Sequence, residues 1–339
     1  MRCGWLNERV LFPVPALKHP VHRFAHTEVD LRTRVLVMAV VNRTPDSFYD
    51  AGATFAFDAA VDAARAAAAD GADWLDVGGV PFAPGEELDP AEEAERVAPL
   101  IAALRAGDGS VHGGEEAARA ILSADTFQPA VAAAALEAGA DVVNDTSGLY
   151  YPDLGRVAAE HGAHLVVTHS LAHLTGPRTV VPRPQYSDVV AEVCEQLLRT
   201  VDRAVSLGVA PEKIIVDPGH DLNKTTVHTL EVTRRLEEVA DLGFPVLAAV
   251  SNKDFVGESL HRPKSQRLAG SLAAAVACVA GGARILRMHQ VRPSVDAARM
   301  VECIAGWRDP VLAEHNTGDL NRDPDLSAVA ADEDWEPGV

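Results

Sequence analysis

The sequence of 339 residues is poor in cysteine and aromatic residues and has no long apolar run. Its four cysteines, Cys3, Cys194, Cys278 and Cys303, are scattered without a C-x-x-C pair, which argues against a disulfide framework or a zinc site and favours a reducing compartment. Because no apolar run is long enough to cross a bilayer, we expect no membrane partner. Residues 1–30 lack the apolar segment of a signal peptide, so the chain is expected to be a cytoplasmic globular protein.

Positive charge is also scarce, with 30 Lys and Arg against 49 Asp and Glu and a net charge of −19. No local basic patch offsets this field, so nucleic acid is not expected as a partner. Residues 309–339 carry nine of the acids and only Arg322 as a base, which predicts a solvated, mobile tail. No G-x-G-x-x-G or P-loop motif occurs, which argues against a nucleotide site on a doubly wound sheet.

The middle of the chain alternates short apolar runs with alanine-rich stretches, and 47% of all residues are hydrophobic. Eight strands are predicted, at 35–41, 74–77, 121–124, 141–144, 164–168, 214–216, 246–250 and 284–288. Each precedes a predicted helix, at 58–70, 89–106, 128–138, 152–161, 187–208, 226–241, 264–280 and 292–306. Eight such units predict a TIM-type (β/α)8 barrel, with the doubly wound sheet as the competing fold.

The predicted organisation is an N-terminal extension over 1–30, a barrel domain over 31–308 and an acidic tail over 309–339. Within the barrel, the glycine-rich segment 105–120 is expected to be a surface excursion before the third strand.

Polar residues stand at the carboxyl end of every predicted strand, where a barrel enzyme places its reactive groups. In chain order they are Asn42, Asp76, Asp125, Asn144, His169, Asp217, Lys253 and Arg287 with His289. A single one of them is adequately explained as a turn or cap residue, but the full set points to a ligand site.

These groups sort by chemistry. Asp125, Asn144 and Asp217 suit the edge of an amidine-like heterocycle, and Arg287 with His289 suits an oxyanion such as phosphate. Asn42 offers a neutral oxygen to a Mg²⁺ that keeps most of its waters, although an Asx turn also explains it. The residues alone therefore indicate a flat polar heterocycle joined to a phosphate. Lys253 suits either half, His169 is expected in the pocket wall, and His220 and Asp221 are nearby polar candidates.

An ordered set of motifs resembles the dihydropteroate synthase family over about residues 33–306, and in particular its divergent second-copy type. Residues 41–48 resemble the signature N-x-T-P-D-S-F. Residues 73–79, 123–126, 144–148, 217–219, 251–253 and 287–289 follow in the family's order. The resemblance implies a barrel, a homodimer and a pterin pocket.

The family's reaction joins p-aminobenzoate to the methylene of 6-hydroxymethyl-7,8-dihydropterin diphosphate, with loss of pyrophosphate. By resemblance, the pterin is held by Asp125, Asn144, Asp217 and Lys253. The diphosphate is held by Asn42, Arg287 and His289, with Mg²⁺ on Asn42, and the implied catalytic groups are Arg287, His289 and Lys253. No covalent enzyme nucleophile is required.

Three loops depart from the family's pattern, all on the acceptor side. The loop commonly written G-G-E-S-T-R-P-G has Phe82 for its threonine and Ala83 for its arginine. The loop usually written D-P-G-x-G-F-G-K loses two glycines and has Leu222 for its aromatic residue. The family's S-R-K becomes 251–253, S-N-K, followed by an acid. The expected acceptor pocket comprises Phe82, Ala83, Leu222, Ser251 and His220.

Several functions therefore remain open from the sequence. The first is a synthase-type transferase, with p-aminobenzoate or a different amine as acceptor. The second is a non-catalytic homologue that binds a pterin or phosphate ligand as a partner or regulatory protein. A methyl-folate-binding methyltransferase ranks last, because no Asp-x-His corrinoid motif occurs in the chain.

Overall fold

A parallel eight-stranded sheet forms the centre of the protein. The structure, a computed structural model, describes residues 11–42, 57–80, 88–109, 112–178, 180–313 and 315. The order of the strands is β8-β7-β6-β5-β4-β3-β10-β9. Their bounds are β3 Leu36–Asn42, β4 Trp74–Gly78, β5 Ile121–Asp125, β6 Val142–Asp145, β7 His164–Thr168, β8 Ile214–Asp217, β9 Leu247–Ala248 and β10 Ile285–Met288.

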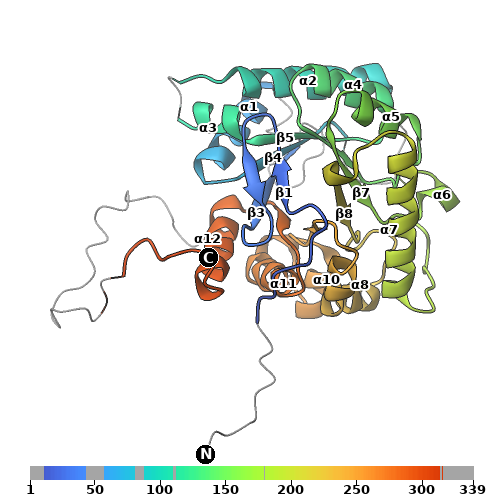
Figure 1. Cartoon of the computed structure of the whole chain (residues 1–339), viewed down its shortest axis with the longest axis vertical. Helices are drawn as coiled ribbons and strands as arrows, with labels where there is room; N and C mark the ends of the chain where they lie inside the picture. The colour runs from blue at the N-terminus through green and yellow to red at the C-terminus, as the bar shows by residue number, and fades with distance from the viewer. Residues whose placement is uncertain are drawn as a thin grey trace, which may run out of the picture.

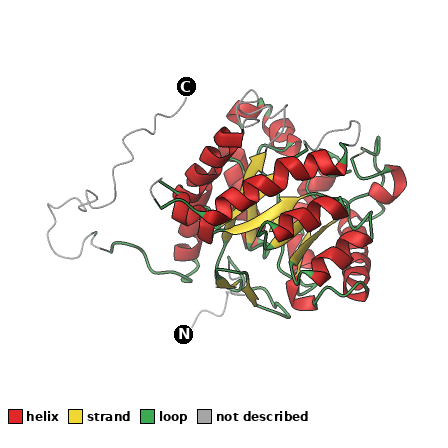
Figure 2. Cartoon of the chain, turned by 90° about the horizontal axis from the view of Figure 1, so that it is seen from above, coloured by secondary structure: helices red, strands yellow, loops and turns green. Residues whose placement is uncertain are grey.

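The sheet is nearly closed on itself. A single parallel bridge pairs Val216 of β8 with Val246 just before β9, and the Val216 amide donates to Pro245 O at 2.9 Å. Helices surround the strands on the outside (Figure 2). The predicted (β/α)8 barrel is therefore confirmed, and the doubly wound alternative is wrong.

The helices follow the strands in the expected alternation. They are α1 Phe57–Ala69, α2 Pro90–Ala106, α3 Gly114–Arg119, α4 Pro129–Glu137, α5 Asp153–Glu160, α6 Ala172–Thr175, α7 Val189–Ser206, α8 Thr226–Arg234, α9 Leu236–Ala240, α10 Asp254–Leu260, α11 Leu268–Ala280 and α12 Val291–Ile304. Two 3-10 turns, Pro211–Lys213 and Lys264–Gln266, precede β8 and α11. Among the described helices, none is long and apolar enough to span a membrane.

Strand periodicity divides the barrel into two apolar layers. Along β3 and the residue before it, Val35 and Val37 face the helices, and Leu36 and Met38 face the barrel axis. The axial layer is completed by Trp74, Ile121, Val142, Val166, Ile215, Leu247 and Ile285. This apolar plug fills the lower barrel, so a polar site fits only above it, at the carboxyl ends of the strands.

An antiparallel hairpin closes the amino end of the barrel. It consists of β1 Val21–Arg23 and β2 Glu28–Asp30, and it lies in front of the barrel in Figure 1. Phe24 between the two strands and Leu31 after them pack into the same apolar cluster as the axial layer. Part of the N-terminal extension therefore covers the amino end of the barrel, although it lies outside the eight strand–helix units.

Three local expectations differ from the structure. Segment 105–120 is not a mere surface excursion, because it contains α3, whose Gly114 and Ala117 are buried. The helix predicted over 226–241 breaks into α8 and α9 at Arg235. The strand predicted over 246–250 shrinks to the two residues of β9.

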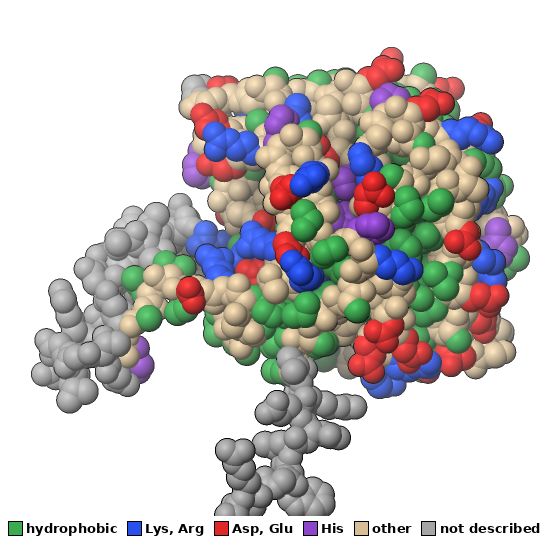
Figure 3. All heavy atoms as spheres, viewed as in Figure 1, with side chains coloured by type: hydrophobic (Ala, Val, Ile, Leu, Met, Phe, Trp, Pro, Cys, Tyr) green, Lys and Arg blue, Asp and Glu red, His purple; other side chains and the backbone are tan. Residues whose placement is uncertain are grey.

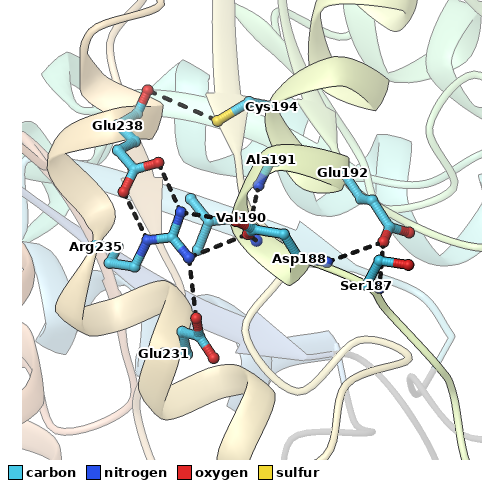
Figure 4. A network of polar contacts seen from close by, with 9 residues as sticks. All are labelled: Ser187, Asp188, Val190, Ala191, Glu192, Cys194, Glu231, Arg235 and Glu238. Carbon is cyan, nitrogen blue, oxygen red and sulfur yellow. Dashed lines mark hydrogen bonds and ion pairs between the residues drawn. The ribbon is translucent and has the colours of Figure 1, made fainter.

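The break at Arg235 is held by a surface network (Figure 4). The Arg235 guanidinium donates to Asp188, which caps α7, at 3.1 and 3.2 Å, and to Glu231 and Glu238 at 2.6–2.9 Å. Such exposed pairs each contribute little to stability, so the network mainly sets the register between α7 and the α8–α9 pair. On the face seen in Figure 3, basic side chains are interspersed with acidic ones.

Candidate active site

A buried carboxylate, Asp76, organises the floor of the barrel mouth. Its side chain, on β4, is 0% exposed and accepts hydrogen bonds from Ser123, from Asn144 Nδ2 at 3.1 Å and from Arg287 Nε at 2.7 Å. Ser123 in turn accepts from the indole nitrogen of Trp74 at 2.7 Å. The apolar plug and the polar floor are thus joined by a chain of hydrogen bonds, which fixes the rotamers above it.

Strand register brings the expected pterin residues to one level. Asn42, Gly78, Asp125 and Asn144 are successive register partners across β3, β4, β5 and β6. A Cβ on Gly78 would lie 3.4 Å from Asn42 Oδ1 and 3.8 Å from Asp125 Oδ2, so both oxygens flank that glycine. The barrel itself therefore places three of the expected ligand groups side by side.

Arg287 joins the two ends of the described site. From β10 it donates to Asp76 and, through Nη2, to Asp125 Oδ2 at 2.8 Å. Burial raises the pKa of Asp125 to about 7, against the opposing effect of Arg287, and Asp76 raises it further. A carboxyl group with a pKa of about 7 is present in both protonation states at neutral pH. It is therefore able to accept a ligand N–H when ionised or to hold a proton.

Asp217 and Lys253 complete the same layer. Burial raises the pKa of Asp217, whose Oδ1 accepts from Gly219 N at 2.7 Å, while Lys253 and Lys224 lower it. Burial lowers the pKa of Lys253, and Asp221, Asp217 and Asp125 raise it. The charge of Lys253 therefore interacts with those of the carboxylates of β5 and β8.

His289 has a defined orientation next to Ser251. The Ser251 oxygen accepts from the His289 backbone N–H at 3.1 Å and lies 3.0 Å from Nδ1 of the ring. The Ser251 hydroxyl is able to donate its own proton to Nδ1 while it accepts from the backbone, and in that arrangement the ring proton is on Nε2. Burial, helped by Arg287, lowers the pKa of His289 to about 4. The ring is therefore neutral at pH 7.

The expected acceptor residues are less uniformly placed. Phe82 and Ala83 lie outside the described residues. Leu222, on the loop after β8, is 8% exposed, and Ser251, on the loop after β9, is 3% exposed. His220 is 0% exposed, stacks on Phe255 at 6.3 Å and approaches Cys278 Sγ at 3.9 Å, so its ring packs beneath the loop.

His169, which the sequence predicts to lie in the pocket wall, is a buried residue held by a neighbouring lysine. It is 1% exposed, and its Nδ1 lies 2.8 Å from the amine of Lys224. Burial lowers the pKa of that lysine to about 7, and Asp217 raises it. The Lys224 amine also donates to Gly219 O and Leu222 O at 3.0 and 3.2 Å, so it holds the β8 loop together.

Sequence reasoning missed Ser123, Lys224 and Glu93 as parts of the site. Glu93 of α2 is 3% exposed and is hydrogen-bonded to Thr126. Its negative charge raises the pKa of Asp125. The signal for Ser123 was its alternation with Asp125 on a buried strand, which directs both side chains to the axis. Lys224 stands in a motif that was recognised, but its contacts depend on the folded loop.

The side chains at the barrel mouth limit how a Mg²⁺ ion could be held. Among the described residues, no group of three or more His, Cys, Asp and Glu side chains is placed to hold a metal ion. A fully protein-bound metal is therefore not supported there. The neutral oxygen of Asn42 beside Gly78 fits a Mg²⁺ held mainly by water and by the phosphates of a substrate.

Comparisons with known proteins agree with this geometry. Residues 38–289 match the family described as pterin binding enzyme. The chain is 45% identical over 281 residues to the "Inactive dihydropteroate synthase 2" of Mycobacterium tuberculosis, covering 82% of this chain and 85% of that protein. It is 35% identical over 285 residues to the dihydropteroate synthase of Synechocystis, covering 83% and 93%.

A solved structure extends the likeness to three dimensions. Xanthomonas albilineans dihydropteroate synthase with 4-aminobenzoic acid superposes with a TM-score of 0.74 at 34% identity, covering 85% of this chain and 98% of that chain. The extent of these matches, together with the barrel and its polar mouth, leads to one conclusion: the chain belongs to the pterin-binding enzyme family of dihydropteroate synthases and their homologues.

Proposed function

We propose that this protein binds 6-hydroxymethyl-7,8-dihydropterin diphosphate and transfers its pterin-methyl group to an amine, with loss of pyrophosphate. The observation that carries the proposal is the joint placement of carboxylates, an amide, a lysine and an arginine over one apolar plug. Its members are Asp125, Asn144, Asp217, Lys253 and Arg287.

In this proposal the heterocycle lies between β5, β6 and β8. The carboxylates of Asp125 and Asp217 accept from its N–H groups, and Asn144 both donates and accepts. Asp76 takes no direct part, but it holds Asn144 and Arg287 in position from below. The donor atoms are thus oriented before the substrate arrives, which favours the reacting geometry.

The diphosphate is assigned to the other side of the mouth. Arg287 and Nε2 of the neutral His289 donate to its oxygens, and the charge that develops on the departing pyrophosphate strengthens these bonds. Asn42 is the residue that would hold Mg²⁺, which supplies further neutralisation of that charge. Nothing in this scheme requires a covalent intermediate with the protein, since the amine attacks the methylene carbon as pyrophosphate leaves.

Two further properties belong to the proposal. A cytoplasmic location and a homodimer are expected from the sequence and the resemblance. The outer face of α12 exposes Met300 and Ile304 by 58% and 57%, which offers an apolar contact to a second copy.

A second candidate function is a pterin-binding protein without turnover. It is favoured by the name "Inactive dihydropteroate synthase 2" given to relatives 45% identical to this chain, and by the three altered loops. In that case the pterin and diphosphate residues would bind the ligand, but no acceptor would be engaged.

The test is to measure pyrophosphate release from the dihydropterin diphosphate with Mg²⁺, with and without p-aminobenzoate or other amines, and to measure binding of the diphosphate in parallel. Release that depends on an amine supports the transferase. Tight binding without release for any amine supports the non-catalytic candidate. Failure to bind the diphosphate at all overturns both.

A further inference from the structure

The β8 loop keeps left-handed backbone at the positions where the family's motif has glycine. Asp221 and Asn223 have φ values of 63° and 51°. Aspartate and asparagine tolerate this region better than other side chains, so the turn survives without its glycines. The loop therefore keeps its backbone conformation and gains two polar side chains, one on each side of Leu222 in the sequence.

The Asp221 carboxylate is held at the start of α10. Its Oδ2 accepts from the Phe255 amide at 3.1 Å, and its Oδ1 accepts from the Thr229 hydroxyl at 3.0 Å. The Phe255 amide belongs to the first turn of the helix that begins directly after Lys253. A glycine at 221 leaves this amide without that carboxylate, so the contact is particular to the altered loop.

This carboxylate adds negative charge to the acceptor side of the site. Its negative charge raises the pKa of Lys253, more than any other charged group does, and also raises the pKa of Lys224. The family's S-R-K arginine is Asn252 here, and the β4 loop has lost both its glutamate and its arginine, now Val80 and Ala83. Two positive charges and one negative are lost and two negatives, Asp221 and Asp254, are gained, so this side is three charges more negative than the family's pattern.

We propose that Asp221 makes the acceptor side of this site select a neutral or cationic amine over an amine that carries a carboxylate. The inference rests on the proposed function and names the class of its second substrate. An acceptor carboxylate that enters near the start of α10 would be repelled by Asp221, while a neutral group at the same position would not. Selection of this kind acts by repelling the wrong ligand as much as by attracting the right one.

The test uses two probes of nearly equal shape, p-aminobenzoate and p-aminobenzamide. Each is titrated calorimetrically into the protein saturated with a pterin, pyrophosphate and Mg²⁺, so that no turnover occurs. The amide is expected to bind at least about tenfold more tightly than the acid, which corresponds to ~1.4 kcal/mol. High salt is expected to reduce this preference, because Asp221 is partly exposed to solvent and its repulsion of the acid is then screened.

The variant Asp221→Asn removes the charge and keeps an oxygen for the Phe255 amide. It is expected to improve binding of the acid by about tenfold and to change binding of the amide by less than about twofold. Asp202→Asn, an exposed acid on α7, is the matched control and is expected to change neither. A purely structural role of Asp221 would move both probes together.

Each other outcome has a distinct meaning. Equal affinities for the two probes, preference for the acid, or an unchanged ratio in Asp221→Asn overturns the inference. Pterin binding without binding of either amine also overturns it, while leaving the binding step of the proposed function intact. Absence of pterin binding overturns the proposed function before the amines are compared.

Discussion

The two halves of the site are built from different parts of the fold. The half that we propose for the pterin stands on strands, where the register of neighbouring residues sets the level of each side chain, as for Asp125 and Asn144. The acceptor half stands on loops, where positions depend on left-handed residues and on cross-loop bonds such as Asn223 Oδ1 to the Val181 amide. The pattern of the family is kept on the strands and altered on the loops, so the barrel supports a change of second ligand without a change of the first.

The largest effect is expected from Asp76, because it serves the strand half from below. Asp76→Ala removes the acceptor of Ser123, Asn144 and Arg287 in a fully buried place. The unfolding free energy is expected to fall by about 3–5 kcal/mol, because three buried donors lose their acceptor at a cost of ~1–3 kcal/mol each, although Arg287 keeps its ion pair with Asp125. Urea denaturation measures it, with Asp202→Asn as a surface control within about 0.5 kcal/mol of wild type. A loss below about 1 kcal/mol would show that the network is dispensable.

The next effect separates the two ends of the donor substrate. Arg287→Ala is expected to weaken binding of the dihydropterin diphosphate by about 10–100-fold, in line with the 1.5–3 kcal/mol of charge-assisted hydrogen bonds. Binding of a bare pterin is expected to change much less, since Asp125, Asn144 and Asp217 remain. Fluorescence titration of both ligands gives the two constants. Equal weakening of both refutes the assignment of Arg287 to the anion.

A pH experiment sharpens the contrast further, because burial has raised the pKa of Asp125 to about 7. Between the ordinary pKa of 3.8 and about 7, the folded protein holds a proton that the unfolded chain has released. This contribution to stability is therefore present at low pH and is lost as the pH rises towards 7. The stability of wild type relative to Asp125→Asn is expected to fall over that range, by up to ~1.4 kcal/mol per pH unit, and to level off above it. A constant difference between pH 4 and 7 would contradict the assignment.

The sequence predicted the strand half well and the loop half poorly, for a physical reason. Buried parallel strands are continuous apolar runs, so their ends and the polar residues there, such as Asp217, are visible in the sequence. The bond from Arg287 to Asp76 joins residues 211 positions apart and follows only from closure of the barrel. The hairpin at 21–30 and the seven-residue α10 are too short for a periodic signal, and their stability comes from tertiary contacts.

The contact of Asp221 with Phe255 was hidden for the same reason. The sequence shows that a glycine of the motif is replaced, but not whether the new side chain faces solvent or another element. The sequence also does not show how deeply His169 and His220 are buried, because a histidine at or just after a strand end has the same local pattern whether it lines a pocket or packs beneath a loop.

The smallest effect concerns how the loop half is held. Asn223 has a left-handed backbone, and its Oδ1 accepts from the Val181 amide at 2.7 Å. Asn223→Ala loses the bond and keeps the strain, so a loss of about 1–2 kcal/mol is expected. Asn223→Gly also loses the bond but relieves the strain, so the two terms nearly cancel, to within about 0.5 kcal/mol.

Urea denaturation and exchange of the Val181 amide distinguish these variants of Asn223. Exchange is expected to be faster than in wild type in both, because each removes the same acceptor, while only the alanine variant is clearly less stable. If both variants were destabilised equally relative to wild type, the side-chain bond rather than the backbone strain would dominate, and the loop half would be specified by contacts as tightly as the strand half.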